Sequence, residues 1–402
     1  MPDIVITGTG LITAAGRGAR PVLDLMDNDR TAVTDRSGIW PAATIRLAEQ
    51  PWPEGSAWAN VGKYANAAAH GAVAAAGLAL DRAGRSDTSV RAGTVMAVGS
   101  TGSDELAEEM PRLAALARTD PRPLARMLYE EVPDYSYIRG IPSQLGQFVS
   151  LAAGFRGSNV AVYGEAGAGG MSALAVAVRL LEAGELDRVL VAGVAPPLSA
   201  TATVTLDQEE AVALEAQPGA GPFDLTRAGT LLGQAAAAVV LERSETATAP
   251  PLARVLAAET IGARDRVVAA REAVDLALAA GPRRADLWWA HGAGTVGADA
   301  DECQAVLPAV PGVPVTTSKA TIGNPFECSG IVDLILAVAT LRRGVVPPVG
   351  LLQKLDPALG SPDVVQGDPR AVPGLGTVLL TTLSHGTAAP TAGAALITRE
   401  GL

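Results

Sequence analysis

Short runs of β-branched residues alternate along the chain with longer alanine-rich segments, in which apolar residues recur every three or four positions. The short runs predict buried strands and the longer segments predict helices, because these spacings match the side-chain periods of the two structures. Strands are predicted at 5–8, 95–98, 160–163, 189–194 and 378–383, and helices at about 62–80, 104–116, 170–183, 266–280 and 330–343. This alternation is typical of an α/β protein with a largely buried sheet.

The order of these elements is repeated in the two halves of the chain. Each half has an alanine-rich helix, a strand with a glycine-rich exit and an acidic helix, a strand with a second glycine-rich turn and a buried helix, and then two further strands. The segment ERSETATAPP at 242–251 is a natural joint. We therefore predict a duplicated fold with an N-terminal half over 1–245 and a C-terminal half over 246–402. Two unrelated α/β domains of similar composition are the alternative.

The composition excludes several classes of function. The 402 residues include 31 Lys and Arg against 42 Asp and Glu, a net charge of −11 without a basic cluster, which argues against nucleic acid as a partner. The two cysteines are too few for a disulfide scaffold. The apolar runs are shorter than the ~20 residues of a membrane span, and the N-terminus does not resemble a secretory signal. These features predict a cytoplasmic protein that does not associate with membranes.

Chemistry is expected at glycine-rich turns, because strand ends and the starts of the following helices face the ligand crevice of an α/β fold. Four turns qualify: GEAGAGG at 164–170, HGAGT at 291–295, KATIGNP at 319–325 and LSHGTAAP at 383–390. The first lacks the Gly-Lys-Ser/Thr of a phosphate-binding loop, and GTGLITAAG at 8–16 lacks the glycine spacing of a dinucleotide site. We therefore predict no cofactor and no metal.

Six motifs, in order along nearly the whole chain, resemble the β-ketoacyl synthases of the thiolase superfamily. They are DIVITGTGLIT at 3, GFRGSNVAVYGEAGAGGMSAL at 154, GPFDLTRAGTLLGQAAAAVVLE at 221, AHGAGT at 290, TTSKATIGNPFECSG at 316 and LSHGTAAPTAGAALI at 383. The resemblance implies a thiolase fold, in which two duplicated βαβαβαββ halves form a five-layered αβαβα sandwich. It also implies a dimer and a role in fatty acid or polyketide chain assembly.

The chain departs from this family at the catalytic positions. Active members have a nucleophilic cysteine at the start of the buried helix, where the helix dipole favours the thiolate, and the matching position here is Gly167. The first family histidine is retained as His291, whereas the second corresponds to Asn324, in the turn that begins at Lys319. Asparagine can donate a hydrogen bond but cannot carry a proton at pH 7. The resemblance therefore implies that this chain itself lacks catalysis.

A ketosynthase-like chain without the cysteine resembles the chain length factor of type II polyketide synthases, the non-catalytic half of a heterodimer with an active ketosynthase. The segment EAGAGGMSAL at 165–174 is similar to the EQAGGLDAL of relatives, although Gly167 replaces the glutamine. That replacement, with the retained His291, favours a divergent branch such as the highly reducing, polyene-making systems. The implied partners are an active ketosynthase and, through the complex, an acyl carrier protein.

In the family, the segment before GFRG lies at the dimer interface and reaches the partner's pocket. The matching stretch is PDYSYIRGIPSQLGQFVSL at 133–151. A spacing of three to four residues predicts that one helical face presents five side chains to the interface or the acyl tunnel. These are Tyr137, Ile138, Ile141, Gln144 and Phe148. For each of them, ordinary core or interface packing is the alternative.

Four other residues could take part in chemistry, but structural roles are the preferred interpretation. We interpret His70 as a packed or surface histidine, Glu165 as a helix cap or an interface ligand, Cys328 as a core residue, and His385 as a structural residue or a neighbour of the vestigial pocket. Two functional alternatives stay open. One is an unconventional condensing or malonyl-decarboxylating enzyme that uses His291, and the other is a scaffold that binds carrier protein and partner enzymes without shaping a tunnel.

Overall fold

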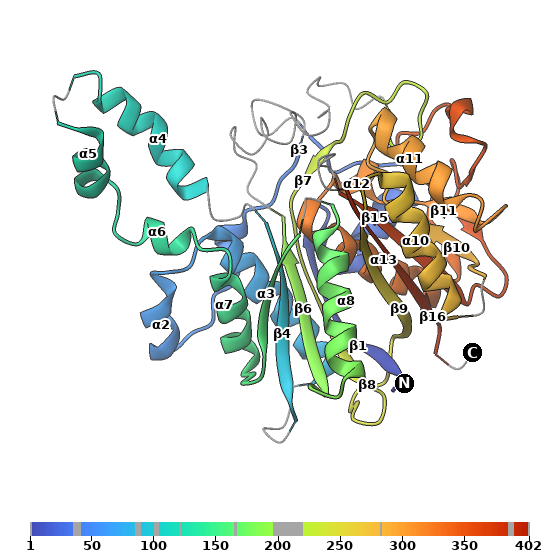
Figure 1. Ribbon diagram of the computed structural model, residues 1–402, viewed down its shortest axis with the longest axis horizontal. Coiled ribbons are helices and arrows are strands. Elements are labelled where there is room, and N and C mark those ends of the chain that lie inside the picture. The colour runs from blue at the N-terminus through green and yellow to red at the C-terminus, as the bar shows by residue number, and fades with distance from the viewer. Residues whose placement is uncertain are drawn as a thin grey trace.

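The computed structural model describes residues 2–34, 42–84, 90–99, 104–119, 122–164, 167–195, 220–281, 284–384 and 390–400. In this part of the chain, a body of strands and helices carries a projecting helical arm (Figure 1). The strands are β1 (Ile4–Thr13), β2 (Gly16–Arg17), β3 (Ala42–Ala43), β4 (Ala92–Val98), β5 (Asn159–Tyr163), β6 (Arg188–Val194), β7 (Leu232–Gly233), β8 (Ala235–Arg243), β9 (Ala253–Gly262), β10 (Leu287–Trp289), β11 (Pro314–Thr316), β12 (Val345–Val346), β13 (Asp363–Val364), β14 (Arg370–Ala371), β15 (Thr377–Leu383) and β16 (Thr391–Thr398).

The helices are α1 (Ala19–Met26), α2 (Ser56–Gly62), α3 (Ala67–Ala83), α4 (Asp104–Leu116), α5 (Leu124–Glu131), α6 (Ser136–Arg139), α7 (Gln144–Ala153), α8 (Gly169–Glu182), α10 (Arg266–Ala279), α11 (Val296–Val306), α12 (Lys319–Ile322) and α13 (Ser329–Arg343). Three short 3₁₀ turns lie at 47–49, 326–328 and 357–359. The α/β fold class predicted from the alternating pattern is confirmed.

The large sheet repeats one strand order in its two halves. From its centre outward, one half runs β1, β8, β6, β4 and β5, and the other runs β9, β16, β15, β10 and β11, followed by the short β13. The halves join where β1 and β9 pair antiparallel over Ile4–Ile6. Beyond this point the two strands part, because β1 continues along β8 and β9 continues along β16. The predicted boundary between 1–245 and 246–402 stays a prediction.

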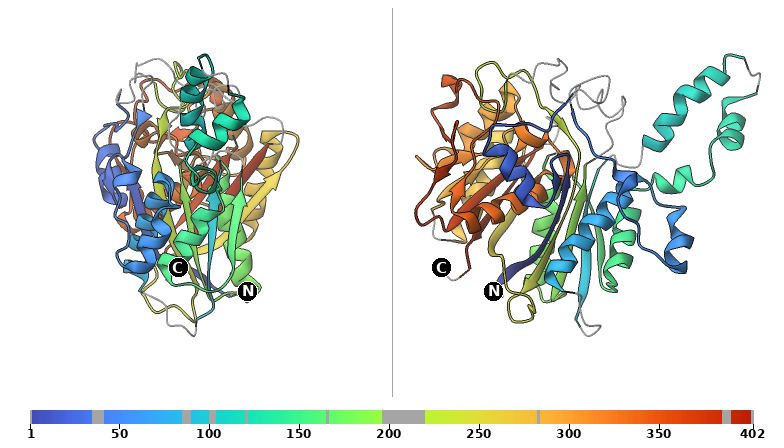
Figure 2. Two further views of the ribbon diagram at one scale, coloured as in Figure 1. Left: turned by 90° about the vertical axis from the view of Figure 1, so that its left-hand side faces the viewer. Right: turned by 180° about the vertical axis from the view of Figure 1, so that it is seen from behind.

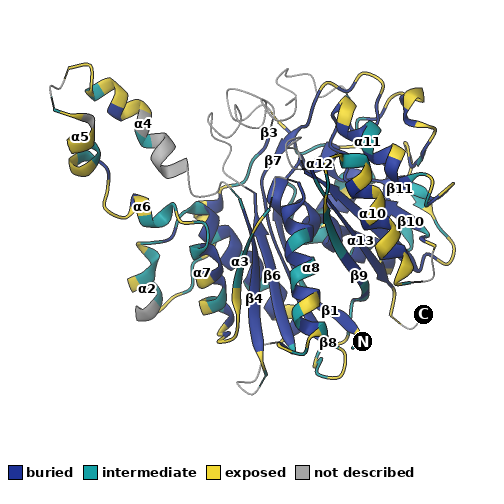
Figure 3. Ribbon diagram, viewed as in Figure 1, coloured by how far each residue is buried: buried dark blue, intermediate teal, exposed yellow. Residues whose placement is uncertain are grey.

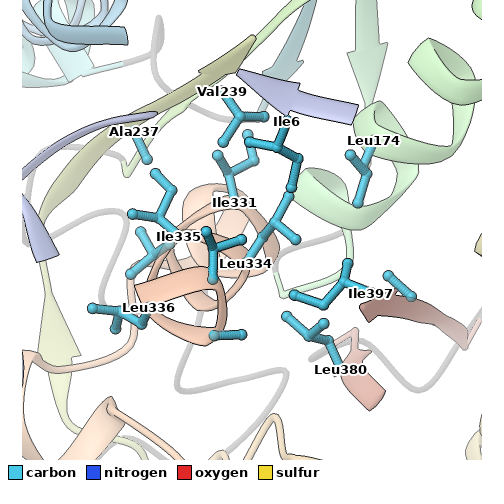
Figure 4. Close-up of a cluster of buried hydrophobic side chains, with 14 of the residues drawn as sticks. Ile6, Leu174, Ala237, Val239, Ile331, Leu334, Ile335, Leu336, Leu380 and Ile397 are labelled. Carbon is cyan, nitrogen blue, oxygen red and sulfur yellow. The ribbon is translucent and has the colours of Figure 1, made fainter. Parts of the chain in front are cut away.

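Helices form three layers around the two halves of the sheet. The outer faces are covered by α3 and α7 on one side and by α10 and α11 on the other, while α8 and α13 lie between the halves. The cluster in Figure 4 shows this middle layer, where α13 meets side chains of both sheet halves and of α8. Its labelled members are Ile6, Leu174, Ala237, Val239, Ile331, Leu334, Ile335, Leu336, Leu380 and Ile397. The chain therefore has the five-layered αβαβα arrangement.

Small residues allow α3 to lie unusually close to β1. A Cβ atom added to Gly8 would lie 2.1 Å from the carbonyl oxygen of Ala79, and one added to Gly10 would lie 2.0 Å from that of Ala75. Any larger residue in the strand would force the two elements apart. The helix begins where Asn66 caps it, since the side-chain oxygen of Asn66 accepts a hydrogen bond of 2.9 Å from the N–H of Ala69.

A helical arm, formed by α4 to α6 (residues 104–139), projects from the body beside α7 and α2. The view from behind shows the arm standing clear of the body (Figure 2). Leu113, Met127 and Val132 form a small buried cluster of their own within it. Much of its described surface is exposed, in contrast to the strands of the body (Figure 3). The arm therefore depends on few contacts with the rest of the molecule.

Candidate functional site

Two of the four degenerate family positions come together between α8 and β10. Gly167 lies just before α8, and His291 follows β10. A Cβ atom built on Gly167 would lie 3.3 Å from Cε1 of His291. The fold thus still assembles the place where a nucleophile and a histidine would meet, although residue 167 has no side chain.

The backbone at Gly167 has no room for a side chain. Its φ of +98° lies in the region that favours glycine. A Cβ atom there would lie only 2.1 Å from the carbonyl oxygen of Leu383, which is well inside van der Waals contact. Because that oxygen belongs to the backbone at the end of β15, it cannot swing aside as a flexible side chain would. The site is therefore closed to a cysteine in its present geometry.

The loop that carries His291 is held by a buried carboxylate. Glu302 of α11 accepts hydrogen bonds from the backbone N–H of His291 (2.7 Å, Oε1) and of Gly292 (2.9 Å, Oε2), and the hydroxyl of Thr381 donates to Oε1 at 2.5 Å. Burial raises the pKa of the Glu302 carboxyl to about 7. Thr317 completes the cradle by donating to the carbonyl oxygen of His291 at 3.1 Å. His291 is thus fixed in a rigid setting.

Sequence reasoning missed Glu302. The signal in the sequence is that Asp299 and Glu302 are three residues apart in the helix that follows the HGAGT turn; the structure shows that both are buried. Acidic residues are seldom fully buried unless they bind something. Asp299 binds the loop as well, since its Oδ1 accepts a hydrogen bond of 3.0 Å from the N–H of Gly294.

Lys319 points its charge into the interior. Its Nζ atom lies 2.9 Å from Oδ2 of Asp333, and both side chains are almost completely buried. Asp333 also accepts hydrogen bonds from the indole N–H of Trp289 (3.1 Å) and the hydroxyl of Ser318 (3.2 Å). The Asp333 carboxylate therefore ties α12 and β10 to α13.

Asn324 uses its amide to stabilise its own turn. Its Nδ2 group donates to the hydroxyl of Thr230 at 3.2 Å, and its Oδ1 accepts from the N–H of Phe326 at 3.1 Å. The backbone N–H of Asn324 donates to the carbonyl oxygen of Leu231 at 2.7 Å. The side chain is completely buried. It acts as a local structural element rather than as the proton carrier that an imidazole would be.

A second carboxylate, Glu327, lies beside the start of α8. A Cβ atom added to Gly99 would be 1.7 Å from Oε1 of Glu327, and one added to Gly169 would be 3.6 Å from its Cβ. Glu327 is 4% exposed. The first turn of α8 contains no acidic residue of its own, so this carboxylate brings negative charge close to the positive end of the helix dipole. Sequence reasoning missed it, although an acidic residue between two buried glycine turns was a signal.

The five residues predicted for the interface or tunnel do not share one helical face, so that part of the prediction is wrong, while their place at the interface or tunnel stays a prediction. Tyr137 and Ile138 belong to α6, Ile141 lies in the link, and Gln144 and Phe148 belong to α7. Pro142 favours the break between α6 and α7, because proline has no N–H to donate and its ring clashes with the preceding turn. Tyr137 and Ile141 are 50% and 45% exposed, whereas Phe148 is 7% exposed and packs in the core.

The remaining candidates have structural surroundings or lie outside the described residues. The ring of His70 is stacked on Trp52 with 4.6 Å between centroids, and its Nδ1 lies 3.3 Å from the carbonyl oxygen of Gln50. Cys328 is buried and donates to the carbonyl oxygen of Gly193 at 3.2 Å, and Cys303 is buried as well. Burial raises the pKa of both thiols. Glu165 and His385 lie outside the described residues.

No cluster of three or more His, Cys, Asp or Glu in the described part of the chain has an arrangement suited to a metal ion. Among the same residues, none of the helices is long and apolar enough to span a membrane.

Comparison with known families agrees with this fold and site. Residues 1–247 match the β-ketoacyl synthase N-terminal domain, and residues 256–352 match the β-ketoacyl synthase C-terminal domain. The chain therefore belongs to the β-ketoacyl synthase family, as the six motifs predict.

Three curated relatives come from polyketide-producing Streptomyces. The chain is 31% identical over 238 residues to the actinorhodin polyketide putative β-ketoacyl synthase 2 of Streptomyces coelicolor, covering 56% of this chain and 58% of the relative. It is 28% identical over 388 residues to the actinorhodin polyketide putative β-ketoacyl synthase 1 of the same organism, covering 88% of this chain and 80% of the relative. It is 31% identical over 237 residues to the tetracenomycin polyketide synthase ketoacyl synthase β subunit of Streptomyces glaucescens, covering 55% of this chain and 58% of the relative. The first and third matches thus span little more than half of those relatives.

Solved structures share the fold over nearly the full chain. A β-ketoacyl synthase from Burkholderia phymatum superposes with a TM-score of 0.84 at 23% identity, covering 99% of this chain and 100% of that one. The ishigamide ketosynthase/chain length factor superposes with a TM-score of 0.82 at 20% identity, covering both chains completely. At these identities the likeness establishes the thiolase-type fold, which confirms the predicted fold class.

Proposed function

We propose that this chain is a non-catalytic chain length factor of a type II polyketide synthase. In this role it forms a heterodimer with an active ketosynthase, and it contributes walls to the acyl tunnel that limits the length of the polyketide. Its curated relatives include a ketoacyl synthase β subunit of a polyketide synthase, which supports this assignment.

The observation that carries the proposal is the geometry at Gly167. A nucleophile is absent there, and the 2.1 Å approach to the carbonyl oxygen of Leu383 leaves no room for one. The other family positions support the same conclusion, since Lys319 is bound to Asp333 and Asn324 holds its own turn. Because covalent acyl transfer needs a nucleophile at the reacting centre, chemistry is assigned to the partner.

Exposed apolar side chains mark the surface that we assign to the ketosynthase partner. In the large sheet β5 is the terminal strand beyond β4, and Tyr163 at its end is 63% exposed. Tyr137, Ile141 and Leu151, on the neighbouring α6 to α7 segment, are 50%, 45% and 48% exposed. A terminal strand with an open edge, together with exposed apolar side chains on the neighbouring segment, favours association with another chain.

Within that surface, different residues are assigned different tasks. We assign Tyr137, Ile138, Ile141 and Gln144 to the partner interface and the wall of its acyl tunnel, because none of them is buried in this chain. Phe148 supports α7 from its buried side: its ring lies 5.5 Å from that of Trp52.

The acyl carrier protein then reaches the chain through the complex with the ketosynthase. Gly167 together with the retained His291 favours a highly reducing, polyene-making system, and the cytoplasm is the compartment that fits such a complex.

The test is co-expression of the chain with a ketosynthase that has the family cysteine and two histidines. A stable one-to-one complex and a shift in product length on changing Ile141→Trp or Ile141→Ala support the proposal. The exposed Leu276→Trp on α10, at 49% exposure, is the matched control. Unchanged product lengths in a stable complex support a scaffold instead. Consumption of malonyl-acyl carrier protein by the chain alone, lost on His291→Ala, supports an enzyme and overturns the proposal.

A further inference from the structure

A surface cavity of about 380 Å³, widely open to solvent, lies between α13 and the edge of β1. Half of its lining comes from α13, and the rest from β1, α1, α3 and the segment before β9; the residues are Thr9, Ala19, Arg82, Leu252, Ile335, Val338, Ala339 and Arg342. The cavity is separate from the degenerate site. Gly330, which lies beside the start of α8, and Arg342 are twelve positions apart along α13, a separation of about 18 Å at 1.5 Å per residue.

The part of the lining that α13 and Leu252 contribute between the arginines is apolar. Ile335, Val338 and Ala339 lie three to four residues apart and so share one face of α13. Leu252 closes the wall where β9 leaves β1, since its backbone N–H donates to the carbonyl oxygen of Ile6 at 2.7 Å. Leu252 and Ala339 are only partly buried, so apolar surface of the central core is open to the cavity.

Two arginines at the edge of the cavity give it a positively charged rim. Arg82 comes from the last turn of α3 and Arg342 from the last turn of α13, and both are exposed. In the part of the chain that the structure describes, neither guanidinium makes an ion pair or a hydrogen bond. By contrast, the adjacent Arg343 forms an ion pair with Asp27. Two uncompensated arginines at one cavity are unexpected in a chain with a net charge of −11.

We propose that this cavity binds a small molecule with an anionic head and a short aliphatic chain. The planar guanidinium groups suit a carboxylate or a phosphate monoester, which they can bind through two parallel hydrogen bonds. The face of α13 and Leu252 suit the chain, because covering them removes apolar surface from water. The volume is near the lower end of the range for small-molecule sites. This site is independent of the proposed pairing with a ketosynthase.

A structural explanation of the two arginines makes a different prediction. Each lies near the carboxyl end of a helix, where a positive charge interacts favourably with the helix dipole. That role would change stability slightly on substitution and would leave ligand binding unaffected. It does not account for the meeting of two separate helix ends at a single apolar cavity.

The experiment is calorimetric titration of the full chain with octanoate, octyl phosphate, 1-octanol and inorganic phosphate. We expect one saturable site for octanoate or octyl phosphate, with the tighter ligand identifying the head group, and at least tenfold weaker binding of 1-octanol and inorganic phosphate. Arg82→Gln and Arg342→Gln should each weaken binding about fivefold or more. Both residues are exposed, so these variants should fold. Arg20→Gln is the control, because Arg20 lies next to Ala19 but pairs with Asp24.

Three results would overturn the proposal. The first is the lack of a saturable site for both octyl anions. The second is equal binding of 1-octanol, which would show that the arginines add nothing. The third is unchanged affinity in Arg82→Gln and Arg342→Gln. Occlusion of the apolar lining by Ala339→Phe tests the location, since binding at this cavity requires that change to abolish the heat of octanoate binding.

Discussion

The ammonium group of Lys319 lies 2.9 Å from Oδ2 of Asp333, with both side chains about 2% exposed. A buried ion pair of this kind stabilises a fold only while both partners are present, because either charge alone in the interior is costly. The pair joins the turn before Asn324 to the central helix α13. In this chain a family position therefore serves the architecture.

Asp333→Asn should strongly destabilise the protein, because it leaves the Lys319 ammonium buried without its counter-ion. We expect a loss of about 3 kcal/mol or more in the free energy of unfolding, measured by urea denaturation. Asp24→Asn, which removes the exposed partner of Arg20, should cost less than about 1 kcal/mol. Adding Lys319→Met to Asp333→Asn should recover part of the loss. Additive effects of the two changes would contradict the coupling.

Gly167→Ala should cost more than a comparable change elsewhere, because it adds a backbone clash to the cost of positive φ. Gly344→Ala is the matched control: its φ is +72°, and an added Cβ would meet no atom within 4 Å. We expect about 1–2 kcal/mol for the control and at least about 2 kcal/mol beyond that for Gly167→Ala. Thermal or urea unfolding measures both.

Gly167→Cys should not restore acyl transfer, for the same steric reason. Incubation with an acylated carrier protein, followed by mass spectrometry of the intact chain, should find no acyl adduct on this variant. An adduct in a variant of native stability would show that the Leu383 carbonyl moves aside easily. It would contradict the proposal that the fold has no room for a nucleophile at this position.

Glu302 should make stability fall as pH rises. The folded carboxyl, with a pKa of about 7, keeps its proton over a range in which the unfolded group, near 4.5, has already lost it. The folded state therefore binds more protons between these two values, and the contribution of Glu302 to stability decreases by about 3 kcal/mol as the pH rises from about 4.5 through 7. Glu302→Gln removes this contribution, so the stability difference between native and variant should shrink as pH rises. Parallel pH profiles would contradict the assignment.

Ile141→Asp should weaken association with a ketosynthase partner and make the isolated chain less prone to self-association. A charge on an apolar contact surface must be desolvated when the surface is covered, which costs several kcal/mol unless it is paired. Leu276→Asp, at a similarly exposed site on α10, should leave association unchanged. Analytical ultracentrifugation of the chain alone and with partner separates these outcomes, and equal behaviour of the two variants would argue against this surface.

Periodicity predicted the helices well where a helix is set by its own sequence. The predicted 104–116, 170–183 and 266–280 each lie within one residue of the observed helices. The predicted start at 62 was wrong, because Asn66 caps the helix and a turn precedes it. The short pattern at 5–8 also underestimated the length of β1, which has ten residues because β8 pairs along nearly all of it.

The strand β8 shows where local sequence is insufficient. Its start, Ala235–Ala238, has little intrinsic preference for a strand, yet it lies between β1 and β6 with every residue buried. Tertiary pairing decides such a segment. The motifs located Gly167, His291, Lys319 and Asn324, whereas Glu302 and Asp333 became apparent only in the structure, because the fold turns the following helix back onto the residue that each of them binds.

The two buried cysteines give the molecule a built-in reporter of its own opening. Cys303 lies in the outer layer with α11, and Cys328 lies beside the central helix, so a thiol reagent in solvent can reach each only after a different part of the fold has separated. The ratio of their labelling rates compares how often the periphery and the centre open under native conditions. With only two thiols in the chain, that comparison needs no engineered probe.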